Sequence, residues 1–222
     1  MADNEYIIDV QQESVLATNK VLRNTYMLLS MTLVFSTVTA WFAVATQAAP
    51  MGFIPLLIGF YGLFFLTSKL SNSVWGIVST FALTGFMGYT LGPIVGFYLS
   101  MANGSELVMT ALGMTAVVFL GLSGYALVSR KDFSFLAGFI TAGFFVLLGA
   151  IVVSLFWDIS GLSLAISAGF VLFSSAVILM QTGQIINGGE RNYIMATITL
   201  YVSIYNLFLS LLHILGVMGG ND

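Results

Sequence analysis

Long runs of apolar residues, separated by short polar breaks, fill most of the chain. Because the hydrocarbon core of a bilayer takes about 20 residues of helix, seven of these runs are long enough to cross it. They lie at 24–46, 52–68, 74–100, 107–128, 133–156, 161–187 and 193–217. The breaks are short, so consecutive helices should be antiparallel neighbours with no second folded domain between them. The pattern predicts an all-α, polytopic membrane protein with seven transmembrane helices in one bundle.

Composition supports this fold class. Of the 222 residues, 59% are hydrophobic and 7% are charged, whereas about 25% of residues are charged in a soluble domain. The absence of cysteine excludes disulfides and thiolate metal sites. No basic surface for nucleic acid is present. We therefore expect the lipid bilayer as the environment and no nucleic-acid partner, and we predict no metal or cofactor site.

The residues before the first run, MADNEYIIDVQQESVLATN at 1–19, are polar and acidic. They are predicted to form a disordered acidic cytoplasmic tail, followed by a transmembrane domain over 20–222. The first apolar run is too long for a cleaved signal peptide, and the residues before it are acidic rather than basic.

The basic residues indicate the orientation of the bundle. All six precede the first run or lie in alternate breaks: Lys20, Arg23, Lys69, Arg130, Lys131 and Arg191. The opposite side holds Glu106, Asp158 and Asp222, without lysine or arginine. Since basic loops stay in the cytoplasm, the N-terminus is predicted inside and the C-terminus outside.

Polar residues form a stripe on each of the last two helices. On the seventh, six polar residues and one alanine recur at helical spacing: Asn192, Ala196, Thr199, Ser203, Asn206, Ser210 and His213. On the sixth they are Ser163, Ser167, Ser174, Gln181 and Gln184. Polar groups that face lipid are costly, so both stripes are predicted to face the bundle interior. Two interpretations remain: hydrogen bonding between helices, or a polar cavity or ion path.

A ridge of small residues marks the third helix. Gly88, Gly92 and Gly96 follow at intervals of four, and Pro93 interrupts the run. Spacing of this kind favours close helix packing. A break at the proline that lines a cavity is the alternative.

One enzyme motif is present, in GLSG at 121–124 and HILG at 213–216, which fit the serine and histidine motifs of rhomboid intramembrane proteases. A serine nucleophile needs its base within about 3 Å. Ser123 lies about 10 Å from the side that carries Arg130, and His213 lies about 33 Å from the side that carries Arg191, at 1.5 Å per residue. The two side chains are therefore predicted near opposite faces, and we expect no catalytic residues and no enzyme.

Three segments resemble the Bax inhibitor-1 (TMBIM) family: KVLRNTYMLLSMTLVFS, GFMGYTLGPI and NYIMATITLYVSIYNLFLSLLHILG. The similarity runs from residue 20 to the end. In the calcium-leak members of this family, two aspartates in the last two long helices form a proton-sensitive latch. The resemblance places Gln181, in LMQTGQ, and Ser203, in LYVSIYN, at these two positions, and Asn206 is retained.

Glutamine and serine do not titrate, so the latch should be absent here or rebuilt as a neutral hydrogen bond. Calcium also prefers carboxylate oxygens. Within the family, the chain is most similar to a bacterial branch that modulates an FtsH-type, ATP-dependent membrane protease. The resemblance therefore implies a bacterial inner-membrane protein that binds and restrains such a protease. A calcium or cation leak without the aspartate latch is the alternative.

Overall fold

The computed structural model describes the backbone of residues 2–219 and the side chains of residues 20–219. The described chain is all-α, as predicted, and each of its seven helices has a segment long and apolar enough to cross a membrane. The helices are α1 (Ala2–Ala45), α2 (Phe53–Leu70), α3 (Val74–Leu99), α4 (Gly104–Ser129), α5 (Leu136–Phe156), α6 (Leu162–Ile186) and α7 (Tyr193–Gly219). All of the predicted ends except the start of the first helix agree with these bounds to within three residues.

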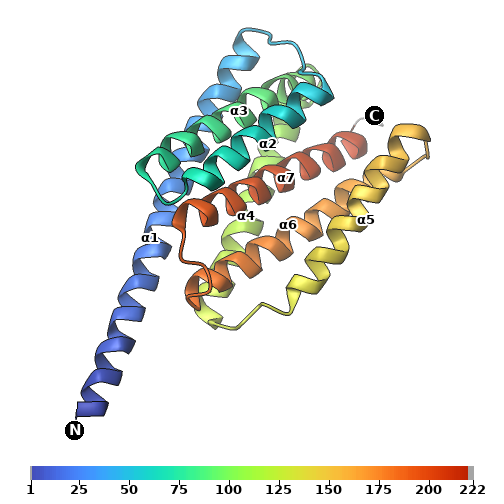
Figure 1. The fold of residues 1–222 in the computed structure, drawn as a ribbon. Helices are drawn as coiled ribbons and strands as arrows, with labels where there is room; N and C mark the ends of the chain where they lie inside the picture. Colours follow the sequence, from blue (N-terminus) through green and yellow to red (C-terminus); the bar gives the residue numbers. More distant parts are fainter. Residues whose placement is uncertain (1, 220–222) are drawn as a thin grey trace.

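The last helix forms the centre of the bundle. In its most apolar stretch, 56% of the residues of α7 are buried, against 6% in α2 and in α5. α7 packs against α1, α3, α4 and α6, while α2 packs mainly on α3 and α5 on α6. Figure 1 shows α7 between the α2–α3 pair and the α5–α6 pair. The helix that carries the longest predicted polar stripe is therefore the one most enclosed by protein.

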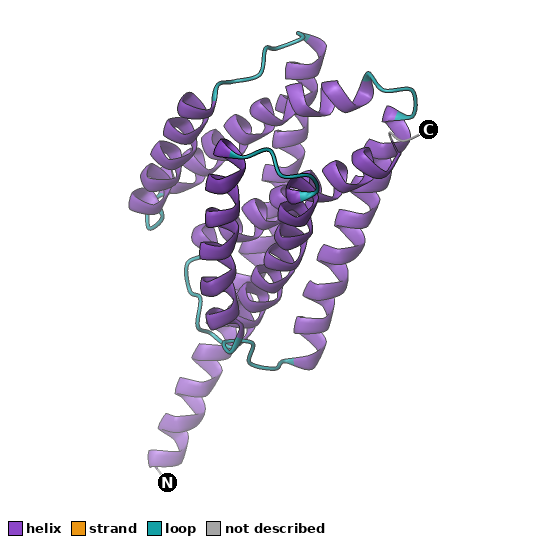
Figure 2. Ribbon diagram, turned by 90° about the vertical axis from the view of Figure 1, so that its right-hand side faces the viewer, coloured by secondary structure: helices purple, strands orange, loops and turns teal. Residues whose placement is uncertain are grey.

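The first helix begins earlier than predicted. Its backbone is helical from Ala2 to Ala45, and residues 2–19, which were expected to be a disordered tail, form its first part. No glycine or proline between residues 2 and 45 interrupts the helical backbone. This part projects from the end of the bundle in both views (Figures 1 and 2). The side chains of residues 2–19 lie outside the described part of the chain, and the boundary at residue 19 stays a prediction.

Two glycines let α3 approach α1 closely. A Cβ atom added to Gly88 would collide with the backbone carbonyl of Ser36, and one added to Gly92 would lie 2.8 Å from the carbonyl oxygen of Ala40. Gly96 does not belong to this contact, contrary to the prediction, because no atom lies within 4 Å of its ideal Cβ. α1 ends at Ala45, two residues beyond Ala43, which is the residue that faces Gly92.

The proline of α3 does not break the helix. α3 runs without interruption from Val74 to Leu99, with Pro93 in its interior. The alternative interpretation, a helix break at Pro93 that lines a cavity, is therefore wrong. The interpretation of close helix packing holds for Gly88 and Gly92.

Candidate functional site

The polar stripe of α7 lies along the core-facing side of the helix over much of its length. Ser203 and Ser210 are buried, while Thr199, Asn206 and His213 are half-buried. Ser203 donates a hydrogen bond from Oγ to the Thr199 carbonyl, 2.8 Å away on its own helix. Asn206, at the middle of the stripe, therefore stands less deep in the bundle than the two serines.

The stripe of α6 is buried along three of its predicted positions. Ser167, Ser174 and Gln181 are at most 9% exposed, while Gln184 is half-buried and Ser163 is exposed at the start of the helix. α6 and α7 pack closely against each other. The two stripes thus lie at or beside one helix interface.

Within residues 20–219, one side-chain hydrogen bond joins the two stripes. It links Ser167 Oγ to His213 Nδ1 over 2.9 Å, near the start of α6 and the end of α7. Gln181 and Ser203 are each 5% exposed, yet no hydrogen bond joins them. The amide nitrogen of Gln181 and the hydroxyl of Ser174 have no hydrogen-bond partner among the described atoms. The neutral Gln181–Ser203 hydrogen bond that we considered is therefore not formed.

Carboxylates lie outside this interior. Among residues 20–219, the acidic side chains are Glu106 in the first turn of α4, Asp132 and Glu190 in loops, and Asp158 in the loop before α6. No group of three histidine, aspartate or glutamate side chains in the described chain could hold a metal ion. The described interior between α6 and α7 is consequently polar, and it contains hydroxyl, amide and imidazole groups but no carboxylate.

Sequence analysis missed a second polar contact at the centre of the bundle. Tyr201, 1% exposed, donates a hydrogen bond from its hydroxyl to the carbonyl of Thr84 over 3.2 Å, and the same hydroxyl pairs with Ser36 Oγ. The contact ties α7 to α1 and α3. A tyrosine deep in an apolar helix needs a partner for its hydroxyl, and this requirement was the available signal.

The loop after α6 fastens neighbouring loops together. Asn192 caps α7, because its side-chain oxygen accepts hydrogen bonds from the backbone nitrogens of Ile194 and Met195 at 3.0 and 3.1 Å. Its amide nitrogen donates to the Ser71 carbonyl at 3.3 Å and to Asn72 at 3.1 Å. Each of these contacts lies at the end of the bundle to which the basic loops belong.

A second asparagine extends this network to the loop between α4 and α5. Asn187 donates from Nδ2 to the Lys131 carbonyl over 3.3 Å. Beside it, hydrogen bonds from the hydroxyl and backbone nitrogen of Ser134 hold the pKa of Asp132 below its usual value, so that this exposed carboxyl stays ionised. The loops that carry Arg130, Lys131 and Arg191 are thus linked, at one end of the bundle, to the loop that follows Lys69 and the end of α2.

The serine and histidine of the rhomboid-like motifs are not brought together. Ser123 is buried in α4, six residues before the end of that helix, and His213 is bonded to Ser167. At the opposite end of α4, Asn103 donates to the carbonyl of Gly219, the last residue of α7, at 3.4 Å. Ser123 lies 20 residues from Asn103, about 30 Å along a helix, whereas His213 lies only six residues from Gly219. Ser123 and His213 therefore lie near opposite ends of the bundle.

The relation to known proteins agrees with this architecture. The family model described as inhibitor of apoptosis-promoting Bax1 matches residues 18–220. The chain belongs to the Bax inhibitor-1 family. The match covers α1 from residue 18 onward and the whole of α2 to α7.

Relatives in this family are similar over nearly the whole chain. An uncharacterized protein of Pseudomonas aeruginosa is 62% identical over 100% of both chains. The "Modulator of FtsH protease YccA" of Escherichia coli K12 is 54% identical over 91% of this chain and 92% of its own. An uncharacterized membrane protein of Vibrio cholerae is 46% identical over 95% of each.

Membership of the Bax inhibitor-1 family draws attention to two buried positions, Gln181 and Ser203. The resemblance aligns Gln181 and Ser203 with the latch aspartates of calcium-leak members. In this chain they lie on adjoining helices and both are buried. Their amide and hydroxyl groups do not ionise.

Proposed function

We propose that the chain is an inner-membrane regulator that binds an FtsH-type, ATP-dependent membrane protease and restrains its attack on other membrane proteins. The observation that carries this proposal is the 54% identity to the Escherichia coli modulator of FtsH protease, over 91% of the chain. The seven long apolar helices of the described chain agree with a protein that acts within the membrane.

Slow unfolding supplies a mechanism for restraint. A protease that grips the N-terminal end of α1 must pull this helix away from α3, α7 and α6, against which it packs. Gly88 and Gly92 hold α1 and α3 at close range, and Tyr201 bonds to Ser36 across the α1–α7 interface. Backbone groups exposed to lipid cost several kcal/mol each, which slows extraction. A chain that is gripped and slow to unfold occupies the protease and so protects other substrates.

The acidic N-terminal residues are the proposed grip. They precede Lys20, where the membrane segment begins, and this part of α1 projects from the bundle (Figure 1). Deleting residues 2–19 should remove the end that the protease engages while leaving the bundle intact. The deleted chain should therefore be degraded more slowly and should protect other substrates less.

A cation leak is the alternative function. A polar interior between α6 and α7 supports it, but the described helices place no carboxylate there to bind or select a cation. The leak would require carbonyl or hydroxyl groups alone to coordinate the ion, and we favour the protease modulator.

The test is degradation of an unrelated membrane protein by a purified FtsH-type protease with ATP in proteoliposomes. Adding the full chain should slow the loss of that substrate, and the variant without residues 2–19 serves as the matched control. Flux of calcium through protease-free liposomes is measured in parallel. If a stoichiometric excess of the chain leaves degradation unchanged while calcium flux is measurable, the leak replaces the protease modulator.

A further inference from the structure

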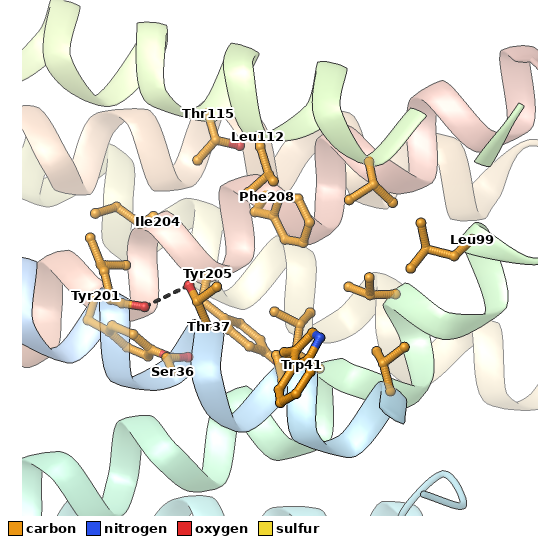
Figure 3. A pocket seen from close by; sticks show the side chains of 16 residues that line it. Ser36, Thr37, Trp41, Leu99, Leu112, Thr115, Tyr201, Ile204, Tyr205 and Phe208 are labelled. Carbon is orange, nitrogen blue, oxygen red and sulfur yellow. Dashed lines mark hydrogen bonds between the residues drawn. The ribbon is translucent and has the colours of Figure 1, made fainter. Parts of the chain in front are cut away.

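A crevice of about 280 Å³ lies between α1, α3, α4 and α7 (Figure 3). Its floor is α7, where Tyr201, Ile204 and Phe208 are at most 9% exposed. Its edges are Trp41 of α1 and Leu112 of α4, which are 69% and 49% exposed. α1 and α4 both pack on α7 but not closely on each other. The crevice therefore opens sideways, between these two helices.

The lining offers little to a polar ligand. It contains no charged residue. The hydroxyls of Thr37 and Thr115 donate to carbonyls of their own helices at 2.8 and 2.7 Å, and Ser36 is bonded to Tyr201. Water needs two to four polar partners to occupy a buried site, and an ion needs opposite charge. The occupant of this crevice should therefore be apolar.

The position of the crevice along α7 shows which part of the bilayer surrounds its opening. Tyr201 and Phe208 lie about 12 and 22 Å along α7, a helix of about 40 Å, so the opening falls within the roughly 30 Å hydrocarbon core. Lipid chains fill that region. An apolar ligand that enters from the bilayer is transferred between two apolar media and pays no cost for leaving water.

The size of the crevice suits a narrow apolar occupant. An apolar cavity of about 150 Å³ accommodates benzene, so a crevice near twice that volume has room for a stretch of one acyl chain. We infer that the crevice binds a single acyl chain of a bilayer lipid, whatever its headgroup.

Bound lipid can be counted by native mass spectrometry of the full chain released from bilayers of phosphatidylethanolamine or phosphatidylglycerol with identical acyl chains. The native chain retains a lipid as detergent is raised, equally from both bilayers. Ala40→Phe, on the α1 wall, and Leu112→Trp, on the α4 edge, fill the crevice and reduce the retained fraction several-fold. Val146→Phe, on the 69% exposed face of α5, is the control and leaves retention unchanged.

Three results would overturn the inference. The first is that the native chain retains no lipid. The second is that both filled variants retain as much lipid as the native chain, and the third is that retention depends on the headgroup. Thermal melting of each variant shows whether it is folded. The two substituted residues lie on different helices, so if one variant fails to fold, lipid retention by the other variant still tests the inference. Lipid retention by the native chain tests it independently of both variants.

Discussion

Nδ1 of His213 in α7 lies 2.9 Å from Oγ of Ser167 in α6, and this hydrogen bond joins the two polar stripes near one end of the bundle. His213→Ala and Ser167→Ala should each destabilise the chain, because each removes the same bond. Hydrogen bonds between membrane helices contribute about 0.6 kcal/mol on average. A double-mutant cycle of unfolding free energies in bicelles should give a coupling of that order. Additive single effects would show that the bond contributes nothing.

The glycine ridge of α3 offers a matched pair of substitutions. Gly88→Ala places a methyl group against the Ser36 carbonyl and the Thr39 hydroxyl, so it should separate α1 from α3. Overpacking of this kind typically costs about 1–3 kcal/mol. Gly96→Ala, on the same helix, meets no atom within 4 Å and should cause no loss of stability.

Thermal melting in detergent measures the difference between the two alanine variants. The same pair tests the proposed mechanism of restraint, since Gly88→Ala should hasten extraction by the protease and Gly96→Ala should not. Equal melting temperatures would remove the α1–α3 contact from the account of slow unfolding.

The fold was accessible to sequence because a membrane helix is encoded locally. Each apolar run carries its own length and hydropathy, and the burial of Ser174, Gln181 and Ser203 follows from periodicity on one helix. Gly96 could not be judged in this way, since its surroundings depend on where α1 ends. The missing hydrogen bond between Gln181 and Ser203 depends likewise on the relative rotation of two helices.

The capping role of Asn192 was within reach of sequence. Asparagine directly before an apolar helix is a common N-cap, and the hydrogen bonds to Ile194 and Met195 have that form. Its contacts with Ser71 and Asn72 were not within reach, because they join loops about 120 residues apart, as their separations of 121 and 120 show.

Orientation in the membrane is a separate prediction. Lys69 at the end of α2 and the loops that carry Arg130 and Arg191 lie at one end of the bundle, joined through Asn187 and Asn192. Since basic loops are retained in the cytoplasm, a periplasm-active reporter fused after Arg130 should be inactive, and one fused at the C-terminus should be active. The reverse pattern of reporter activity would show that the bundle has the opposite orientation in the membrane.

Restoring acid groups at the two latch positions should create a pH response. Gln181→Asp with Ser203→Asp places two carboxyls at sites that are each 5% exposed, on adjoining helices. Burial and mutual repulsion both raise the pKa of a carboxyl in the folded state, while in the unfolded chain it stays at about 3.9. The folded state then binds protons more tightly than the unfolded state.

The sign of the effect follows from this linkage. Relative to the native chain, the double variant should be most stable below about pH 4, and it should lose stability as the pH rises toward the raised pKa. The total loss should be about 1.4 kcal/mol for each pH unit that separates the folded and unfolded pKa values. Melting temperatures of both chains, measured from pH 4 to 8 in the same detergent, give the difference and cancel every pH effect that the two chains share. Gln181→Asn with Ser203→Thr is the uncharged control and should follow the native curve. A native chain with an equally steep loss of stability over this range would show that Gln181 and Ser203 have not removed the pH response.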